Sequence, residues 1–156
     1  MTDIKVNVAM ESLELTSRKA VTGEIYFESN GTYFPELHWN DFIIVVLNWW
    51  LRVIHKIYIS NVGITDEFLF MDGPFLVRGC KVSQETIHMD FIKSQLKGET
   101  ILFSSNCRIG SFSDSVLATA KKIVAEVDNR KWDANELDKL RISIRVLSER
   151  KDRDFL

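Results

Sequence analysis

The segment 41–56 constrains the fold more than any other part of the chain. Its few polar residues are spaced so that they fall on one narrow stripe of a 3.6-residue helix. They are Asp41, Asn48, Arg52 and His55. The rest of the helical circumference is apolar and includes the adjacent Trp49 and Trp50. A helix with so little polar surface must be covered on most sides, so the pattern predicts the buried central helix of a domain, with Asn40 or Asp41 as its N-cap.

Length and composition favour one folded unit. A chain of 156 residues fits a single domain, and 46% hydrophobic with 27% charged residues is typical of globular proteins. The apolar run 42–54 is shorter than the roughly 20 residues that a membrane-spanning helix requires. With a net charge of −2, the chain has no general basic field, so neither nucleic acid nor a membrane is expected as a partner.

The N-terminal third reads as antiparallel strands. Residues 4–10 alternate apolar and polar side chains, and a change of parity near Glu11 indicates a bulge or bend. Further on, Asn30-Gly31 is typical of a two-residue hairpin turn between strands at 23–29 and 32–34. This register places Phe27 opposite Phe34, and Pro35 then ends the pairing.

Residues 64–109 predict a strand meander. Its four expected strands are 66–71, 75–82, 85–92 and 99–109, and each is bounded by turn residues. In the last strand, Ile101, Phe103 and Cys107 share the parity expected to be buried, and polar residues dominate the other parity. Counting from the turns places Cys80 opposite Ile87, and Ile87 opposite Arg108. The expected fold class is therefore α+β, a mostly antiparallel sheet around the buried helix.

The C-terminal third predicts two helices. The first covers 113–128, with Ser111 or Ser113 as its N-cap. The second has a capping-box-like start at Asp133 and Glu136. Its continuation, 138–148, alternates as a strand would, and a helix there leaves Ile142 and Val146 facing outward. We favour the helix, because the capping signal and the charged tail support it.

Sequence motifs for chemistry are absent. The chain has two cysteines, Cys80 and Cys107, in no CxxC pair, and the expected register holds them too far apart for a disulfide. It has no HExxH sequence and no glycine-rich phosphate loop, so neither a metal nor a cofactor is predicted. The N-terminus has no signal-peptide pattern, which predicts a cytoplasmic location.

The candidate binding residues lie around the loop that precedes the central helix. Exposed tyrosine and tryptophan are enriched at protein interfaces, and this loop concentrates them. The predicted binding residues are Tyr33, Phe34, Glu36, His38 and Trp39. The nearby carboxylates that are predicted to give an acidic patch are Glu24, Glu28, Glu36 and Asp41.

A second candidate site lies on the third strand of the meander. His88 and Asp90 share its polar face, where they are close enough to act as an acid–base pair. An enzyme that uses them should have a deep cavity with convergent polar groups. A protein-binding module should instead have an exposed aromatic or acidic surface.

The aromatic segment also carries a resemblance. Phe34, Pro35, Trp39, Asp41, Phe42, Leu47, Trp49 and Trp50 match the pattern FPxxxWxDFxxxxLxWW. This resembles small bacterial proteins that include immunity proteins of toxin systems. The resemblance implies a stoichiometric protein binder, so we expect a non-catalytic module that neutralises a toxin. The alternatives are a small enzyme or ligand-binding protein at His88 and Asp90, and a homodimer that pairs through the aromatic hairpin.

Overall fold

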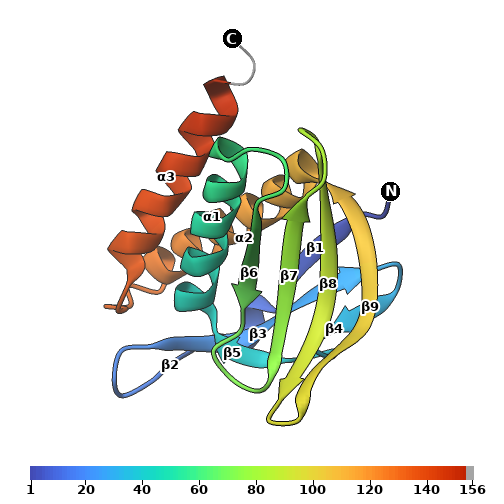
Figure 1. Ribbon diagram of the computed structural model, residues 1–156. Helices are drawn as coiled ribbons and strands as arrows, with labels where there is room; N and C mark the ends of the chain where they lie inside the picture. Colours follow the sequence, from blue (N-terminus) through green and yellow to red (C-terminus); the bar gives the residue numbers. More distant parts are fainter. Residues whose placement is uncertain (154–156) are drawn as a thin grey trace.

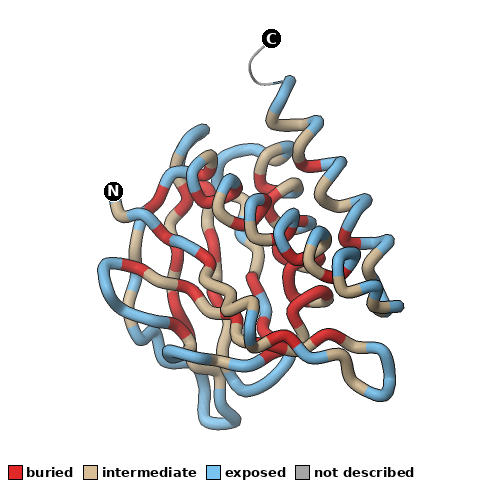
Figure 2. The backbone as a smooth tube through the Cα atoms, turned by 180° about the vertical axis from the view of Figure 1, so that it is seen from behind, coloured by how far each residue is buried: buried red, intermediate tan, exposed pale blue. Residues whose placement is uncertain are grey.

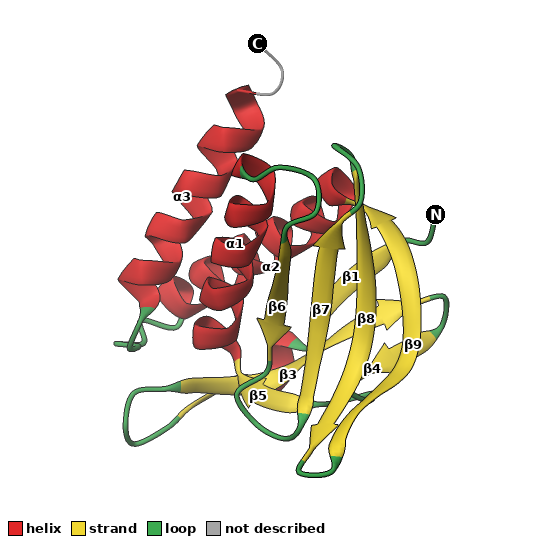
Figure 3. Cartoon of the chain, in the orientation of Figure 1, coloured by secondary structure: helices red, strands yellow, loops and turns green. Residues whose placement is uncertain are grey.

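The computed structural model describes residues 1–153 and combines two antiparallel sheets with three helices. The helices are α1 (Ile43–Ile59), α2 (Ile109–Asn129) and α3 (Leu137–Arg153). They gather on one side of the molecule, and the sheets occupy the other (Figures 1 and 3). The expected α+β class is confirmed.

The first sheet is built around one long strand. Its strands are β1 (Ile4–Val8), β2 (Glu14–Leu15), β3 (Val21–Ser29), β4 (Thr32–Phe34) and β5 (Asn40–Phe42). β3 pairs with all four others, and a short 3-10 helix, η1 (Met10–Ser12), occupies the expected parity change between β1 and β2. The Asn30-Gly31 hairpin has the expected register, with Phe27 opposite Phe34.

The second sheet is the expected meander. It runs in the order β6 (Thr65–Leu69), β7 (Phe75–Lys81), β8 (Thr86–Gln95) and β9 (Gly98–Arg108). Three details of the expected pairing are wrong. Cys80 lies opposite His88 rather than Ile87, because Glu85 belongs to the turn and not to the strand. Ile87 in turn lies opposite Cys107 rather than Arg108. In β9 the register shifts beside Ile92, which faces Ile101, while Phe91 faces Phe103; Ile101 is consequently 55% exposed instead of buried.

The core lies where the two sheets and α1 meet. Phe27 of the first sheet stacks on Trp50 of α1, with ring centroids 4.4 Å apart. Phe34 meets Phe91 of the second sheet edge to face at 5.2 Å. Buried residues line the inner faces of both sheets and the inner sides of α1 and α2 (Figure 2).

The helix boundaries differ from those expected. α1 begins at Ile43 and ends at Ile59, so it starts later and extends further than 41–56. α2 begins at Ile109, before the serines that were expected to cap it, and neither caps its first turn. α3 is helical throughout 138–148, as favoured. The expected helix start at Asp133 is wrong, because Glu136 has a left-handed backbone conformation in place of the helical one that the capping box requires, and the helix begins at Leu137. Ile142 and Val146 face solvent, as a helix requires.

Candidate functional site

The candidate site lies on the outer face of the first sheet. Along β3, buried residues alternate with half-exposed ones, and Glu24, Tyr26 and Glu28 share the outward face. Neighbouring strands and the loop after β4 add further side chains around Tyr26. We name this surface the tyrosine face; it comprises Asn7, Glu24, Tyr26, Glu28, Tyr33 and His38.

Aromatic contacts organise the tyrosine face. The ring of Tyr26 meets Tyr33 edge to face at 5.7 Å between centroids and His38 in the same manner at 6.4 Å. Tyr33, on β4, lies directly opposite Glu28 in the hairpin and is 38% exposed. Edge-to-face packing of this kind fixes the rings in place while leaving Tyr33 and His38 accessible to a partner.

Two carboxylates flank Tyr26. Glu24 is hydrogen bonded to His38, and Glu28 accepts a hydrogen bond of 3.0 Å from the amide of Asn7. Partial burial raises the pKa of the Tyr26 phenol, and the charge of Glu24 and its other neighbours raises it further. A tyrosine phenol is neutral at physiological pH, and the raised pKa keeps the Tyr26 hydroxyl available as a hydrogen-bond donor.

The structure separates the five predicted binding residues. Tyr33 and His38 belong to the tyrosine face, and Glu36 is exposed on the adjoining loop. Phe34 is 0% exposed and belongs to the core, so it has no surface to offer a partner. Trp39 is half-buried against Phe75, with ring centroids 5.4 Å apart, and is mainly structural.

Tyr26 was not predicted, although the sequence contained the signal. The confirmed hairpin register places Glu28 and Tyr33 on one face, and the alternation of β3 puts Tyr26 on that face as well.

Asp41 corrects the predicted acidic patch, because it is 0% exposed. Its carboxylate accepts hydrogen bonds from the indole of Trp39 at 3.1 Å and from the backbone N–H of Phe42 at 2.7 Å. It also accepts from the backbone N–H groups of Met71 and Asp72, at 3.3 and 3.2 Å. Asp41 therefore ties the start of α1 to the loop between β6 and β7 and is not available to a partner.

The alternative site is an open polar ladder. His88 lies between Asp90, whose carboxylate is 2.9 Å from Nε2, and Asn106, whose side-chain oxygen is 2.6 Å from Nδ1. Ser104 donates to the same oxygen of Asp90 at 2.6 Å. These groups are on the outer face of the second sheet, where the side chain of His88 is 39% exposed and that of Asp90 is 24% exposed. Neither residue lines the groove beside α1 or the smaller hollow at the start of α3.

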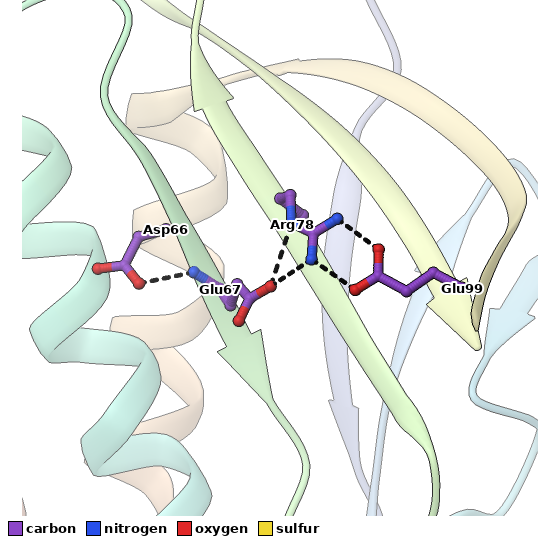
Figure 4. Close-up of polar contacts among 4 residues, drawn as sticks. All are labelled: Asp66, Glu67, Arg78 and Glu99. Carbon is purple, nitrogen blue, oxygen red and sulfur yellow. Dashed lines mark hydrogen bonds and ion pairs between the residues drawn. The ribbon is translucent and has the colours of Figure 1, made fainter. Parts of the chain in front are cut away.

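Arg78 extends this polar surface across the sheet. Its guanidinium bridges Glu67 on β6, at 2.6 Å, and Glu99 on β9, at 2.7 Å (Figure 4). These hydrogen bonds raise the pKa of Arg78 and lower the pKa of the Glu99 carboxyl. Because both carboxylates are paired with Arg78, this cluster joins β6, β7 and β9.

A serine and a lysine meet between α2 and α3. Lys151 Nζ donates to Ser113 Oγ at 2.6 Å, and Tyr58 Oη lies 3.2 Å from the same serine oxygen. This arrangement contains the residue types of a serine nucleophile with a lysine base. Ser113 is 0% exposed, however, and Lys151 is also paired with Asp114 at 2.7 Å. The cluster therefore fastens α3 to α2 and offers no access to a substrate.

The two cysteines are free thiols in different surroundings. Burial raises the pKa of Cys107 to about 12, and the charge of Asp3 adds to this. Cys80 is half-buried and points to the outer face of its sheet. We expect a thiol reagent at about pH 8 to modify Cys80 in the native protein and to leave Cys107 protected, because the reagent requires an accessible thiolate. A native Cys80→Ser variant should show almost no fast reaction with Ellman's reagent; rapid modification of that variant would contradict the burial of Cys107.

Within residues 1–153 no group of three or more His, Cys, Asp or Glu side chains is arranged to hold a metal ion. No helix in that range has the length and apolar character needed to span a membrane. A comparison with protein-family models gave no match, and searches of curated proteins and of solved structures gave none either.

Proposed function

We propose that this chain is a protein-binding module that contacts its partner through the tyrosine face. The observation that carries the proposal is the exposed cluster of Tyr33 and His38 around Tyr26, flanked by Glu24 and Glu28. Tyrosine supplies a large contact area with few rotatable bonds and a polar tip, which is why it is frequent at interface hot spots. The rings are already held in place, so little conformational entropy is lost on binding.

The charge of the tyrosine face favours a basic partner. Glu24, Glu28 and the adjoining Glu36 provide carboxylates, while Lys5, opposite Glu28, provides one ammonium group. A surface with this excess of negative charge steers a positively charged protein toward it and accelerates association. The concrete form of the proposal is an immunity-type protein that binds a basic toxin stoichiometrically, as the resemblance of the aromatic segment implies.

A catalytic role at His88 and Asp90 is the weaker proposal, because these residues lie on an open sheet face.

A homodimer through the hairpin would use the same tyrosine face. Light scattering distinguishes it from a complex with another protein.

Affinity capture from the native host tests the proposal with matched variants. The test variant combines Glu28→Lys with Tyr33→Ala, and the control is Glu149→Lys, which changes an exposed carboxylate on α3. We expect wild type and control to retain the same protein, and the test variant to bind it at least tenfold more weakly, because hot-spot truncations cost about 2 kcal/mol or more. Titration calorimetry with the purified partner should give a one-to-one complex that weakens with added salt.

Equal retention by the test variant would contradict the role of the tyrosine face. Repeated recovery of a metabolite, and of no protein, would contradict the binding module itself.

A further inference from the structure

A groove lies between α1, the edge strand β6 and α3, and it belongs neither to the tyrosine face nor to the polar ladder. It has a cavity volume of about 600 Å³. Binding sites for small organic molecules generally have volumes of about 300–1,000 Å³. The lining residues that matter for recognition are Trp49, Arg52, His55, Leu69, Ser143 and Val146.

Part of the groove is lined by apolar side chains that are exposed to solvent. Val146 is 37% exposed and Leu69 is 41% exposed, and both line the groove with Trp49. Ile142, one turn before Val146 on α3, is 51% exposed. The strand-like alternation of residues 138–148 is explained by this arrangement. α3 carries apolar residues on its core side and again beside the groove.

The charges in the groove leave one cation unpaired. Lys56 pairs with Asp66 at 3.1 Å, and Glu67 shares the guanidinium of Arg78 with Glu99. The guanidinium of Arg52 has no hydrogen bond or ion pair with a side chain or carbonyl of residues 1–153, although it lines the groove. The formal charges of the lining residues balance, but the Arg52 guanidinium is left free to pair with an anionic group of an occupant.

Main-chain pairing along this edge of β6 is obstructed. The N–H of Glu67 donates to the carboxylate of Asp66 at 2.7 Å (Figure 4). The carbonyl of Leu69 accepts a hydrogen bond of 2.8 Å from the indole of Trp50. A peptide strand would find these two groups occupied, so recognition in the groove has to use side chains.

We propose that the groove binds an amphipathic organic anion, a molecule with an aromatic or acyl body and one carboxylate or sulfonate group. The apolar body lies between Trp49, Leu69 and Val146, and the anionic group pairs with the guanidinium of Arg52, whose N–H fork can donate to two oxygens of a carboxylate or of a sulfonate. This inference is independent of the proposed protein-binding function.

Two fluorescent probes test the proposal on the full chain. The anionic probe is 8-anilinonaphthalene-1-sulfonate, and the uncharged probe of similar shape is N-phenyl-1-naphthylamine. We expect both to bind saturably, the anion more tightly. Arg52→Gln should weaken the anion about three- to fivefold, the size of effect of an exposed ion pair, and leave the uncharged probe unchanged. Val146→Glu should weaken both probes, because it replaces apolar surface with a carboxylate, and it should weaken the anion more because the new charge repels it.

The control is Arg145→Gln, which changes an exposed cation next to Val146 that does not line the groove. It should bind both probes as wild type does, and so should the Glu28→Lys, Tyr33→Ala variant of the tyrosine face. Thermal unfolding followed by near-ultraviolet circular dichroism verifies that each variant has native packing. The proposal is overturned if the wild type does not saturate, or if a folded Arg52→Gln variant loses affinity for both probes equally or for neither.

Discussion

Replacing Asp41 with alanine is expected to lower the free energy of unfolding by about 3 kcal/mol. A hydrogen bond to a charged group contributes roughly 1.5–3 kcal/mol, and the buried Asp41 carboxylate accepts four. We expect less than the sum of the four hydrogen-bond contributions, because Met71 is 42% exposed and water can replace the lost acceptor at the loop. Equilibrium urea unfolding monitored by circular dichroism measures the change.

Two further variants separate the causes of this loss. Asp41→Asn keeps the shape and one acceptor oxygen. We expect it to cost about half as much as Asp41→Ala, since the NH2 group that replaces the other oxygen would face two N–H donors and accept from neither. Asp72→Asn changes an exposed neighbour whose backbone N–H donates to Asp41, and it should alter stability by no more than about 0.5 kcal/mol. If Asp41→Ala also fell within that limit, the carboxylate would not be the tie between α1 and the loop.

The N-terminal hairpin was predictable to the residue because its determinants are local. Asn30 and Gly31 both adopt positive φ, and the two-residue turn then fixes every pair in the ladder. The same locality explains why the segment 138–148 was assigned correctly as a helix in spite of its alternation. The charged residues that follow it favour a helix, and Ile142 and Val146 pay only the modest cost of exposure.

The second sheet was predictable in topology but not in detail. Periodicity identified all four strands, yet a three-residue turn at Ser83–Glu85 and an extra residue at Leu102 each displaced the register by one position. A displacement of one residue reverses which face a side chain occupies, which is why Ile101 was assigned to the wrong side. Neither irregularity has a distinctive residue type to reveal it.

Residues that act through tertiary contacts were beyond prediction. Lys81 reads as an ordinary polar strand residue, but it is 2% exposed, and its ammonium group donates to the carbonyls of Ile57 and Ser60 at 2.9 and 2.8 Å. These carbonyls belong to the end of α1, where a cation is favoured by the helix dipole. Only the packing of β7 against that helix end brings the two together, and Asp41 was misjudged for the same reason.

The candidate site was partly predictable, because Tyr33 and Glu28 follow from the hairpin and His38 was expected in the loop after it. The same register places Phe34 on the face opposite Tyr33, but the register alone does not reveal which of the two faces is buried. Which aromatic residue is buried depends on which face of the first sheet the second sheet covers. Phe34 faces Phe91 across that contact, while Tyr33 faces away.

The adjacent tryptophans provide the sharpest test of how the central helix works. Trp50 is 0% exposed, stacks on Phe27 and meets Phe70 edge to face at 5.3 Å. Trp50→Ala is therefore expected to lower the free energy of unfolding by about 3–5 kcal/mol, the usual cost of removing a large aromatic from a core. Trp49 lies half-exposed at the groove, so Trp49→Ala should cost no more than about 1 kcal/mol.

Trp50→Phe isolates the contribution of the indole hydrogen bond. Phenylalanine retains much of the aromatic packing but leaves the carbonyl of Leu69 without its donor, so we expect a loss of about 1–3 kcal/mol. Urea unfolding of all three variants by far-ultraviolet circular dichroism avoids the change in tryptophan fluorescence that each substitution causes. Equal losses for Trp49→Ala and Trp50→Ala would mean that both faces of the helix are covered to the same extent, contrary to the open groove beside Trp49. A large loss at Trp50 alone would show that one tryptophan holds the sheets to the helix, while its neighbour at the groove contributes little to stability.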